Sequence, residues 1–177
     1  TGKLYGSTSV RDPLYNGLIE IDITTGAGTP KGVHGWGLPA GPFGSTAVSN
    51  ITVDSTGHMY GWWDPEQDDL VSIDKATGVA TRVGESGVGT AVNGLDFDSS
   101  DTLYLIKSGG RVYTVDALTG AATHVGNIGT TAHHGDFDPA TNLYCGITSH
   151  RAVPRSLVVV DVAALTVSAL LPDLADD

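Results

Sequence analysis

The sequence predicts an all-β fold, a β-propeller built of four-stranded antiparallel blades. Glycine accounts for 24 of the 177 residues and proline for 8, which leaves little room for long helices. Short stretches alternate apolar and polar residues with the period of two that characterises a half-buried strand. The same motifs return in the same order at an interval of roughly 45 residues, which is typical of propeller blades.

Each repeat contains two motifs that end in aspartate. The first is an alternating strand whose last Asp precedes a Tyr by six residues, as in Asp54 to Tyr60, Asp98 to Tyr104 and Asp138 to Tyr144. The second is an alternating strand that leads into a turn, in most copies Asp-x-x-Thr-Gly. There Asp accepts hydrogen bonds from the turn amides, and Gly adopts a positive φ. The aspartates of this second motif are Asp22, Asp74, Asp116 and Asp161.

The motifs divide one domain, residues 1–177, into four approximate repeats. These are 1–46, 47–88, 89–130 and 131–177. Residues 1–5 align with residues 56–60, so the first blade is expected to lack its innermost strand. Two explanations are open: the chain is part of a longer propeller, or a neighbouring chain supplies the strand. An open blade edge invites pairing with another chain.

Segments 59–84 and 103–126 follow the pattern (Met/Leu)-Tyr, then Asp, then Thr-Gly and Thr-x-Val-Gly. In this pattern, over nearly its whole length, the chain resembles extracellular bacterial β-propeller repeats of the NHL and PQQ-like type ("LY…VD…TGAAT"). The resemblance implies a propeller located outside the cell or at the cell surface. It implies no single function, because such repeats occur in binding, scaffolding and enzymatic proteins. The Trp that follows Thr-Gly in PQQ-dependent dehydrogenase repeats is absent here, which argues against a quinone cofactor.

The composition excludes several classes of partner. The net charge is −11, and the 9 Lys and Arg residues form no basic patch, which argues against nucleic acid. No apolar run approaches the ~20 residues of a membrane span. A single Cys excludes a disulfide within the chain. The Asp-rich, Lys-poor composition also suits a secreted protein, in which the sequon at Asn50 is a candidate glycosylation site.

Ligand contacts are expected where the repeat is interrupted, since loops tolerate insertions that a scaffold does not. Segment 33–44 is long and carries aromatic residues. Trp62 and Trp63 are adjacent in a strand, so one ring is expected to pack between blades. The other is expected to be more exposed, where it can stack on a sugar. The predicted ligand-binding residues are His34, Trp36, Trp62, Trp63, His133 and His134.

An acidic hairpin follows the two tryptophans. Carboxylates are the ligands that Ca²⁺ prefers, so this hairpin is a candidate calcium site. It contains no Asp-x-Asp-x-Asp-Gly loop, and a solvated acidic hairpin is the alternative. The candidate ligands are Asp64, Glu66, Asp68 and Asp69. No other cofactor is expected.

Three functions remain open. The first is a non-enzymatic extracellular propeller that acts as a binding or assembly module, including polymer formation, with a protein partner or a second copy at its open blade edges. The second is a lectin-like propeller that binds glycans. The third is a hydrolase or lyase with its active site at the channel mouth. The repeat is regular, and the nucleophile-elbow, phosphate-loop, zinc-protease and dinucleotide motifs are absent from the sequence. The first function is therefore expected, and no catalytic residue is predicted.

Overall fold

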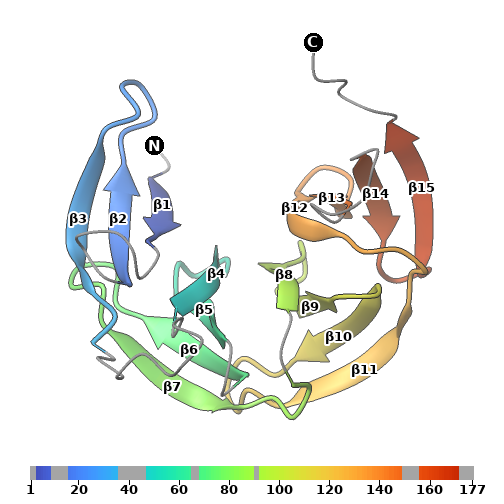
Figure 1. Ribbon diagram of the computed structural model, residues 1–177, viewed down its shortest axis with the longest axis horizontal. Coiled ribbons are helices and arrows are strands. Elements are labelled where there is room, and N and C mark those ends of the chain that lie inside the picture. Colours follow the sequence, from blue (N-terminus) through green and yellow to red (C-terminus); the bar gives the residue numbers. More distant parts are fainter. Residues whose placement is uncertain are drawn as a thin grey trace, which may run out of the picture. The chain divides into compact units, whose positions relative to one another are not determined.

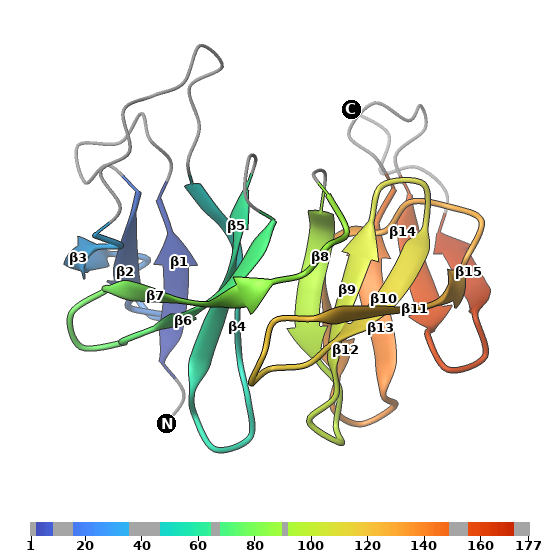
Figure 2. The same cartoon turned by 90° about the horizontal axis from the view of Figure 1, so that it is seen from below.

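The structure is a computed structural model that describes residues 3–8, 16–35, 47–64, 68–89, 92–148 and 156–171. Every regular element among these residues is a β-strand. The strands form four small antiparallel sheets, and strands that follow one another in the chain lie side by side within each sheet (Figures 1 and 2). The described part of the chain therefore has the all-β fold of four propeller blades, and the fold predicted from the repeat is confirmed.

The first blade has three described strands: β1 (Leu4–Ser7), β2 (Gly17–Ile21) and β3 (Gly28–Val33). The second blade consists of β4 (Ala47–Val53), β5 (Met59–Asp64), β6 (Asp69–Ile73) and β7 (Ala80–Glu85). The third consists of β8 (Val92–Phe97), β9 (Leu103–Lys107), β10 (Arg111–Val115) and β11 (Ala122–Asn127). The fourth consists of β12 (His133–Asp138), β13 (Leu143–Ile147), β14 (Leu157–Asp161) and β15 (Thr166–Leu171).

Contacts divide the chain into two compact units. The first unit is Thr1–Thr90 with Leu118–Gly120, and the second unit is Ala91–Ala117 with Ala121–Asp177. The single domain expected from the sequence stays a prediction. Among the described residues, no helix has the length and apolar character needed to cross a membrane.

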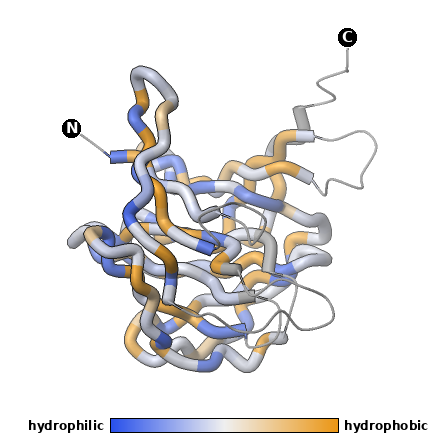
Figure 3. Tube along the Cα trace, turned by 60° about the vertical axis from the view of Figure 1, so that its left-hand side comes forward, coloured by the Kyte–Doolittle hydropathy of each residue, from blue (hydrophilic) through white to orange (hydrophobic). Residues whose placement is uncertain are grey.

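Each unit contains an apolar core between neighbouring blades. Figure 3 shows hydrophobic and hydrophilic residues interspersed along the chain. The core of the first unit is Leu18, Val48, Met59, Trp63, Val71, Ile73 and Ala80. The core of the second unit is Ile106, Val112, Ile128, Ala132, Phe137, Tyr144, Val158, Val160 and Val162. Burial of these side chains holds one sheet against the next.

The turns of the repeat are formed as the sequence predicts. Asp22 Oδ1 accepts hydrogen bonds from the amides of Thr24 at 2.7 Å and Thr25 at 3.0 Å. In the fourth blade Asp161 Oδ1 accepts from Ala163 at 3.0 Å and Ala164 at 2.8 Å, although this copy has lost the glycine. The aspartate alone can therefore cap the turn.

The two outermost strands of every blade share an irregular register. In the first blade Leu18 pairs with Gly32 and Ile19 pairs with Pro30, so one residue of β3 has no partner in the ladder. The equivalent ladders β6–β7, β10–β11 and β14–β15 each contain such a shift. A bulge at this position twists the outer strand and makes its free edge a poor template for pairing with other chains.

Two glycines allow the first two blades to approach closely. A Cβ on Gly32 would collide with the carbonyl oxygen of Thr77. Gly78 has a φ of +76°, and a Cβ there would lie 2.5 Å from the carbonyl oxygen of Gly32. The turn between β6 and β7 thus packs directly on β3, and glycine is required on both sides of the contact.

Candidate functional site

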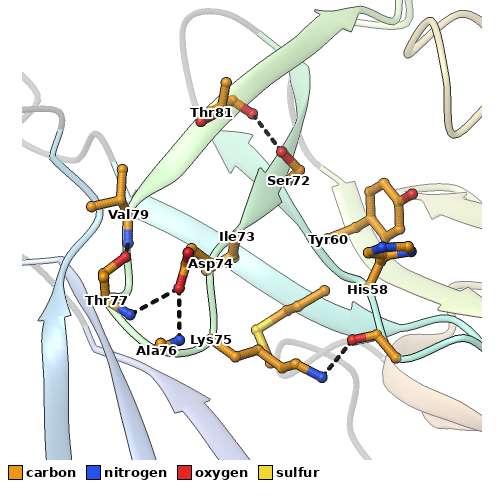
Figure 4. A pocket seen from close by; sticks show the side chains of 12 residues that line it. His58, Tyr60, Ser72, Ile73, Asp74, Lys75, Ala76, Thr77, Val79 and Thr81 are labelled. Carbon is orange, nitrogen blue, oxygen red and sulfur yellow. Dashed lines mark hydrogen bonds between the residues drawn. The ribbon is translucent and has the colours of Figure 1, made fainter.

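A groove of about 880 Å³ runs along the second blade, where the β4–β5 turn lies close to the β6–β7 turn. Figure 4 shows the side chains that line it, with His58 and Tyr60 on one side and Thr77 and Val79 on the other. All of its lining residues belong to the first unit.

Aspartate caps hold both turns of the groove in place. Asp54 Oδ1 accepts hydrogen bonds from the amides of Thr56 at 3.0 Å and His58 at 2.8 Å. Asp74 Oδ1 accepts from Ala76 at 2.7 Å and Thr77 at 3.0 Å. The amide of Thr77, and then that of Ala76, lowers the pKa of Asp74 below its ordinary value. Both carboxylates accept hydrogen bonds that shape the turns, so they are poor candidates for proton transfer.

The inner wall of the groove is a cross-strand row of hydroxyl groups. Tyr60, Ser72 and Thr81 lie opposite one another on β5, β6 and β7. Ser72 Oγ donates to the carbonyl oxygen of Thr81 at 3.4 Å, and Lys75 Nζ donates to the carbonyl oxygen of Gly57. Burial, and then the charge of Asp54, raises the pKa of the Tyr60 hydroxyl, so this group is neutral at physiological pH. The wall offers neutral hydrogen-bonding groups and one ammonium.

Three side chains at the groove's rim bear a superficial likeness to a catalytic triad. Thr56 Oγ1 lies 2.8 Å from His58 Nδ1, and Asp54 Oδ2 lies 3.5 Å from the same nitrogen. However, Thr56 Oγ1 donates its proton to Asp54 Oδ1 at 2.8 Å, so the imidazole does not take it. An activated nucleophile requires the base to accept that proton. The cluster therefore caps a turn and has no geometry for nucleophilic catalysis.

The third blade has a smaller groove, of about 360 Å³, at the equivalent position. It lies between the β8–β9 turn and the β10–β11 turn, and it is lined by Thr114 and Thr123, which correspond to Ser72 and Thr81. Because the groove recurs with the repeat, it is a feature of blade architecture and not a centre specific to one blade. His58 and Lys75 are what the second blade adds to it.

The structure places the predicted aromatic residues mostly in the interior. Trp62 has an exposed fraction of 0% and Trp63 of 8%. The expectation that one of the two rings is more exposed is wrong, because both faces of β5 are covered. Trp36 lies outside the described residues. Trp62 Nε1 is buried with no hydrogen-bond partner among the described residues.

The predicted histidines differ in their surroundings. His34 is buried, with an exposed fraction of 1%, and it lies directly after β3. His133 is buried and His134 is exposed at the start of β12, in the second unit, with their ring centroids 5.8 Å apart. His134 has a φ of +45°, which belongs to a register shift in β12.

The predicted calcium ligands are divided between described and undescribed parts of the chain. Glu66 and the side chain of Asp64 lie outside the described residues. Asp68 is half-buried next to β6, and Asp69 is fully buried and bonded to Arg82. Over the described ranges, no three His, Cys, Asp or Glu side chains are grouped so as to hold a metal ion. The calcium site stays a prediction.

The glycosylation candidate lies in a strand. Asn50 is half-buried on β4, and its Nδ2 donates to Ser49 Oγ at 3.1 Å. The third residue of the sequon, Thr52, is buried at 7% exposure. This position stays a prediction as well.

Sequence reasoning did not single out the groove residues Ser72, Lys75 and Thr81. Ser72 and Thr81 lie at regular positions of the repeat, and no motif distinguishes them, whereas Lys75 stands where the third repeat has Ala117. The signal that could have found Ser72 and Thr81 is the pairing register of the three strands. That register sets Tyr60 opposite Ser72 and Ser72 opposite Thr81, so the three side chains share one face of the sheet.

No protein-family model matches the sequence, and no curated protein matches it. Solved structures do match. A GH43 glycoside hydrolase engineered to display endo-xylanase and exo-arabinofuranosidase activity matches with a TM-score of 0.69 at 13% identity, over 98% of this chain and 40% of its own. TolB from Acinetobacter baumannii matches with a TM-score of 0.57 at 12% identity, over 91% of this chain and 39% of its own. Hydrazine synthase from Kuenenia stuttgartiensis matches with a TM-score of 0.57 at 15% identity, over 89% and 43%.

The chain spans about two fifths of the length of these solved chains. At such low identities the matches show the fold alone. By fold the chain is therefore a β-propeller protein, and its structural neighbours support no specific function.

Proposed function

We propose that this chain is a non-enzymatic binding and assembly module that acts outside the cell or at its surface. The observation that supports the proposal is that, among the described residues, one edge of β1 has no partner strand. In the second, third and fourth blades the corresponding strand, which is β5, β9 or β13, pairs on both sides. Among the described residues, β1 pairs with β2 alone.

The open edge of β1 is suited to strand addition. Its register with β2 is continuous from Leu4 to Ser7, with no bulge to blunt the edge. The amide of Thr8 donates to the carbonyl oxygen of Gly17 at 2.8 Å. Because bonded and non-bonded pairs alternate in an antiparallel ladder, the amides of Tyr5 and Ser7 point away from β2. A strand from another protein chain can pair with these amides. If that chain is a second copy of this one, the purified protein self-associates.

Most of the described acidic and histidine side chains that could serve in catalysis instead form structural contacts. The repeated aspartates cap turns, and His34 lies in the interior. The third function, a hydrolase or lyase, therefore has less support than a binding module. The lectin-like alternative also has less support, because Trp62 and Trp63 offer no exposed ring face for stacking on a sugar.

A pair of substitutions at Ser7 tests the proposal. Ser7→Ala removes the hydroxyl that donates to Val48 O at 2.7 Å, whereas Ser7→Pro removes that hydroxyl and also the outward amide. Sedimentation velocity over a range of concentrations should show association of the wild type and of Ser7→Ala, and its loss in Ser7→Pro. A wild type that stays monomeric throughout, or a Ser7→Pro chain that associates as Ser7→Ala does, contradicts assembly through β1.

A further inference from the structure

His34 joins the first two blades through its side chain. Its ring is buried, with 1% exposed. Nδ1 lies 2.7 Å from the carbonyl oxygen of Gly78, in the β6–β7 turn. A carbonyl oxygen only accepts, so Nδ1 carries a proton and donates it. Nε2 lies 3.4 Å from Ser7 Oγ on β1, and that hydroxyl in turn donates to Val48 O on β4 at 2.7 Å.

The backbone of His34 extends the same junction. Its amide donates to the carbonyl oxygen of Asn16 at 2.9 Å, and its carbonyl oxygen accepts from the amide of Ala80 at 3.1 Å. The side chain of Asn16 also crosses between the blades, since its Oδ1 accepts from the amide of Val48 at 3.1 Å. We call these contacts, formed by Ser7, Asn16, His34, Val48, Gly78 and Ala80, the His34 junction. All of it lies within the first unit.

The His34 junction contains no negative charge to balance a protonated imidazole. The ring's partners, Gly78 O and Ser7 Oγ, are both neutral. Among the side chains that the structure describes, the charged groups on the strands and turns around it have partners elsewhere. Glu20 forms ion pairs with Lys3 and Lys31, and Asp69 forms one with Arg82, which Glu85 also approaches. Asp54 and Asp74 cap turns, and Lys75 donates to the carbonyl oxygen of Gly57.

We propose that the His34 junction is a pH-sensitive latch, which holds the first blade on the second while the imidazole is neutral and releases it when the imidazole is protonated. A buried cation without a counter-charge is costly, and opening the junction hydrates it. Burial lowers the pKa of His34, and the hydrogen bond to Gly78 offsets only part of this effect. The latch concerns the docking of the first blade and does not depend on the proposed function.

The direction of the pH dependence follows from proton linkage. Above the ordinary histidine pKa of about 6.5, the closed and open junctions are both neutral and stability is unaffected. Below it the open state binds a proton that the closed state does not, so the equilibrium for opening rises about tenfold for each pH unit. The dependence ends at the lower pKa of the closed state, where both forms are protonated.

Native-state hydrogen exchange, corrected for the intrinsic pH dependence of amide exchange, tests this latch. The reporters are the amides of Ala80 and Val48, which donate across the two blades to His34 O and Asn16 Oδ1. The reference amides are those of Ile128 and Thr148, which donate to Gly110 O and Ser156 O in the second unit. We expect protection of the reporters, relative to the reference amides, to fall about tenfold per pH unit below about 6.5.

Two histidine variants separate the latch from general acid effects. His34→Gln keeps an amide donor for Gly78 O but does not titrate, so its reporters should lose the pH dependence. His58→Gln changes an exposed histidine of the same unit, with 76% of its side chain accessible, and should behave as the wild type. A pH dependence that persists in His34→Gln, or reporters that follow the reference amides in the wild type, overturns the proposal.

A direct titration keeps the test decisive if His34→Gln does not fold. The imidazole carbon resonances of His34 in the wild type should titrate below about 6.5, the ordinary histidine value. A midpoint at or above that value overturns the latch, because protonation would then favour the closed junction.

Discussion

Arg82 and Asp69 form a two-point ion pair across neighbouring strands of the second blade. Arg82 Nε donates to Asp69 Oδ2 at 2.6 Å, and Nη2 donates to Oδ1 at 3.0 Å. The carboxylate is fully buried, whereas the arginine side chain is 49% exposed. The guanidinium thus covers a charge that would otherwise be buried unpaired, and its planar geometry satisfies both oxygens at once.

Loss of this guanidinium should destabilise the first unit. Arg82→Gln leaves the Asp69 carboxylate buried without its ionic partner, so we expect the melting temperature to fall by several degrees. Glu85→Gln is the matched control. Glu85 lies at the edge of the same pair, 4.0 Å from Arg82 and 73% exposed, and its removal should have little effect. Thermal unfolding followed by circular dichroism measures both. Equal melting temperatures for the two variants would show that the pair contributes nothing.

The contact between Gly78 and Gly32 should be sensitive to a single methyl group. Gly78→Ala adds a positive-φ penalty and a clash with the carbonyl oxygen of Gly32, so it should cost at least about 3 kcal/mol of unfolding free energy. Gly26 has the same role in the β2–β3 turn, at a φ of +73°, with open space around it. Gly26→Ala should therefore cost only about 1 kcal/mol, the backbone penalty alone.

Urea unfolding of both alanine variants gives these two free energies. A Gly78→Ala chain that is no less stable than Gly26→Ala would contradict the close approach of the β6–β7 turn to β3.

Acid should weaken the β6–β7 turn within a defined pH range. Hydrogen bonds from the amides of Thr77 and Ala76 lower the pKa of Asp74. Because the folded pKa lies below the unfolded value of about 3.9, the cap's contribution is complete above that value and disappears as the pH falls through the folded pKa. Asp74→Asn keeps an acceptor oxygen and should remove this pH dependence. NMR titration of the Asp74 carboxyl carbon reports the midpoint, and a midpoint at the ordinary value would refute the cap.

The hydroxyl of Tyr144 bonds to β12 where the register of that strand shifts. It accepts a hydrogen bond from the amide of Gly135 at 2.8 Å, and the ring is 1% exposed. Tyr144→Phe leaves that amide without its acceptor and should cost about 1–2 kcal/mol. Tyr104→Phe, which keeps the ring's contact with Phe137 at 5.5 Å, is the matched control and should cost less. Chemical denaturation distinguishes them, and equal free energies would exclude a role for the hydroxyl.

Burial also raises the pKa of Tyr144, and the hydrogen bond from Gly135 offsets only part of this rise. In a spectroscopic alkaline titration, the wild type and Tyr144→Phe should therefore ionise the same number of tyrosines until the protein unfolds. An extra ionising tyrosine in the folded wild type would show that the hydroxyl is accessible.

The repeat made the blades predictable, because its signals are local. Asp22 and Asp74 accept hydrogen bonds from amides two and three residues ahead, so the sequence contains the whole turn. Alternation likewise places residues on one face of a strand without reference to the rest of the chain. For these reasons the strand order, the caps and the shortened first blade follow from the sequence.

The candidate site was less predictable because its residues depend on distant partners. The sequence predicts Asp69 as a calcium ligand. In the structure its carboxylate accepts two hydrogen bonds from Arg82 on the next strand. Trp62 and Trp63 were expected to differ in exposure, but sheet packing covers both faces of β5. The ligand contact expected at His34 stays a prediction, and its ring bonds to the carbonyl oxygen of Gly78, 44 residues away.

The sequence by itself determined the type of blade and the residues that cap each turn, because these follow from backbone chemistry between near neighbours in the chain. It also determined the number of repeats, because the same motifs recur along the chain. Only the tertiary structure decided which polar side chains stay in solvent and which join blades. The reason is physical: burial and hydrogen bonding between blades depend on how closely two sheets approach, as the contact between Gly32 and Gly78 shows.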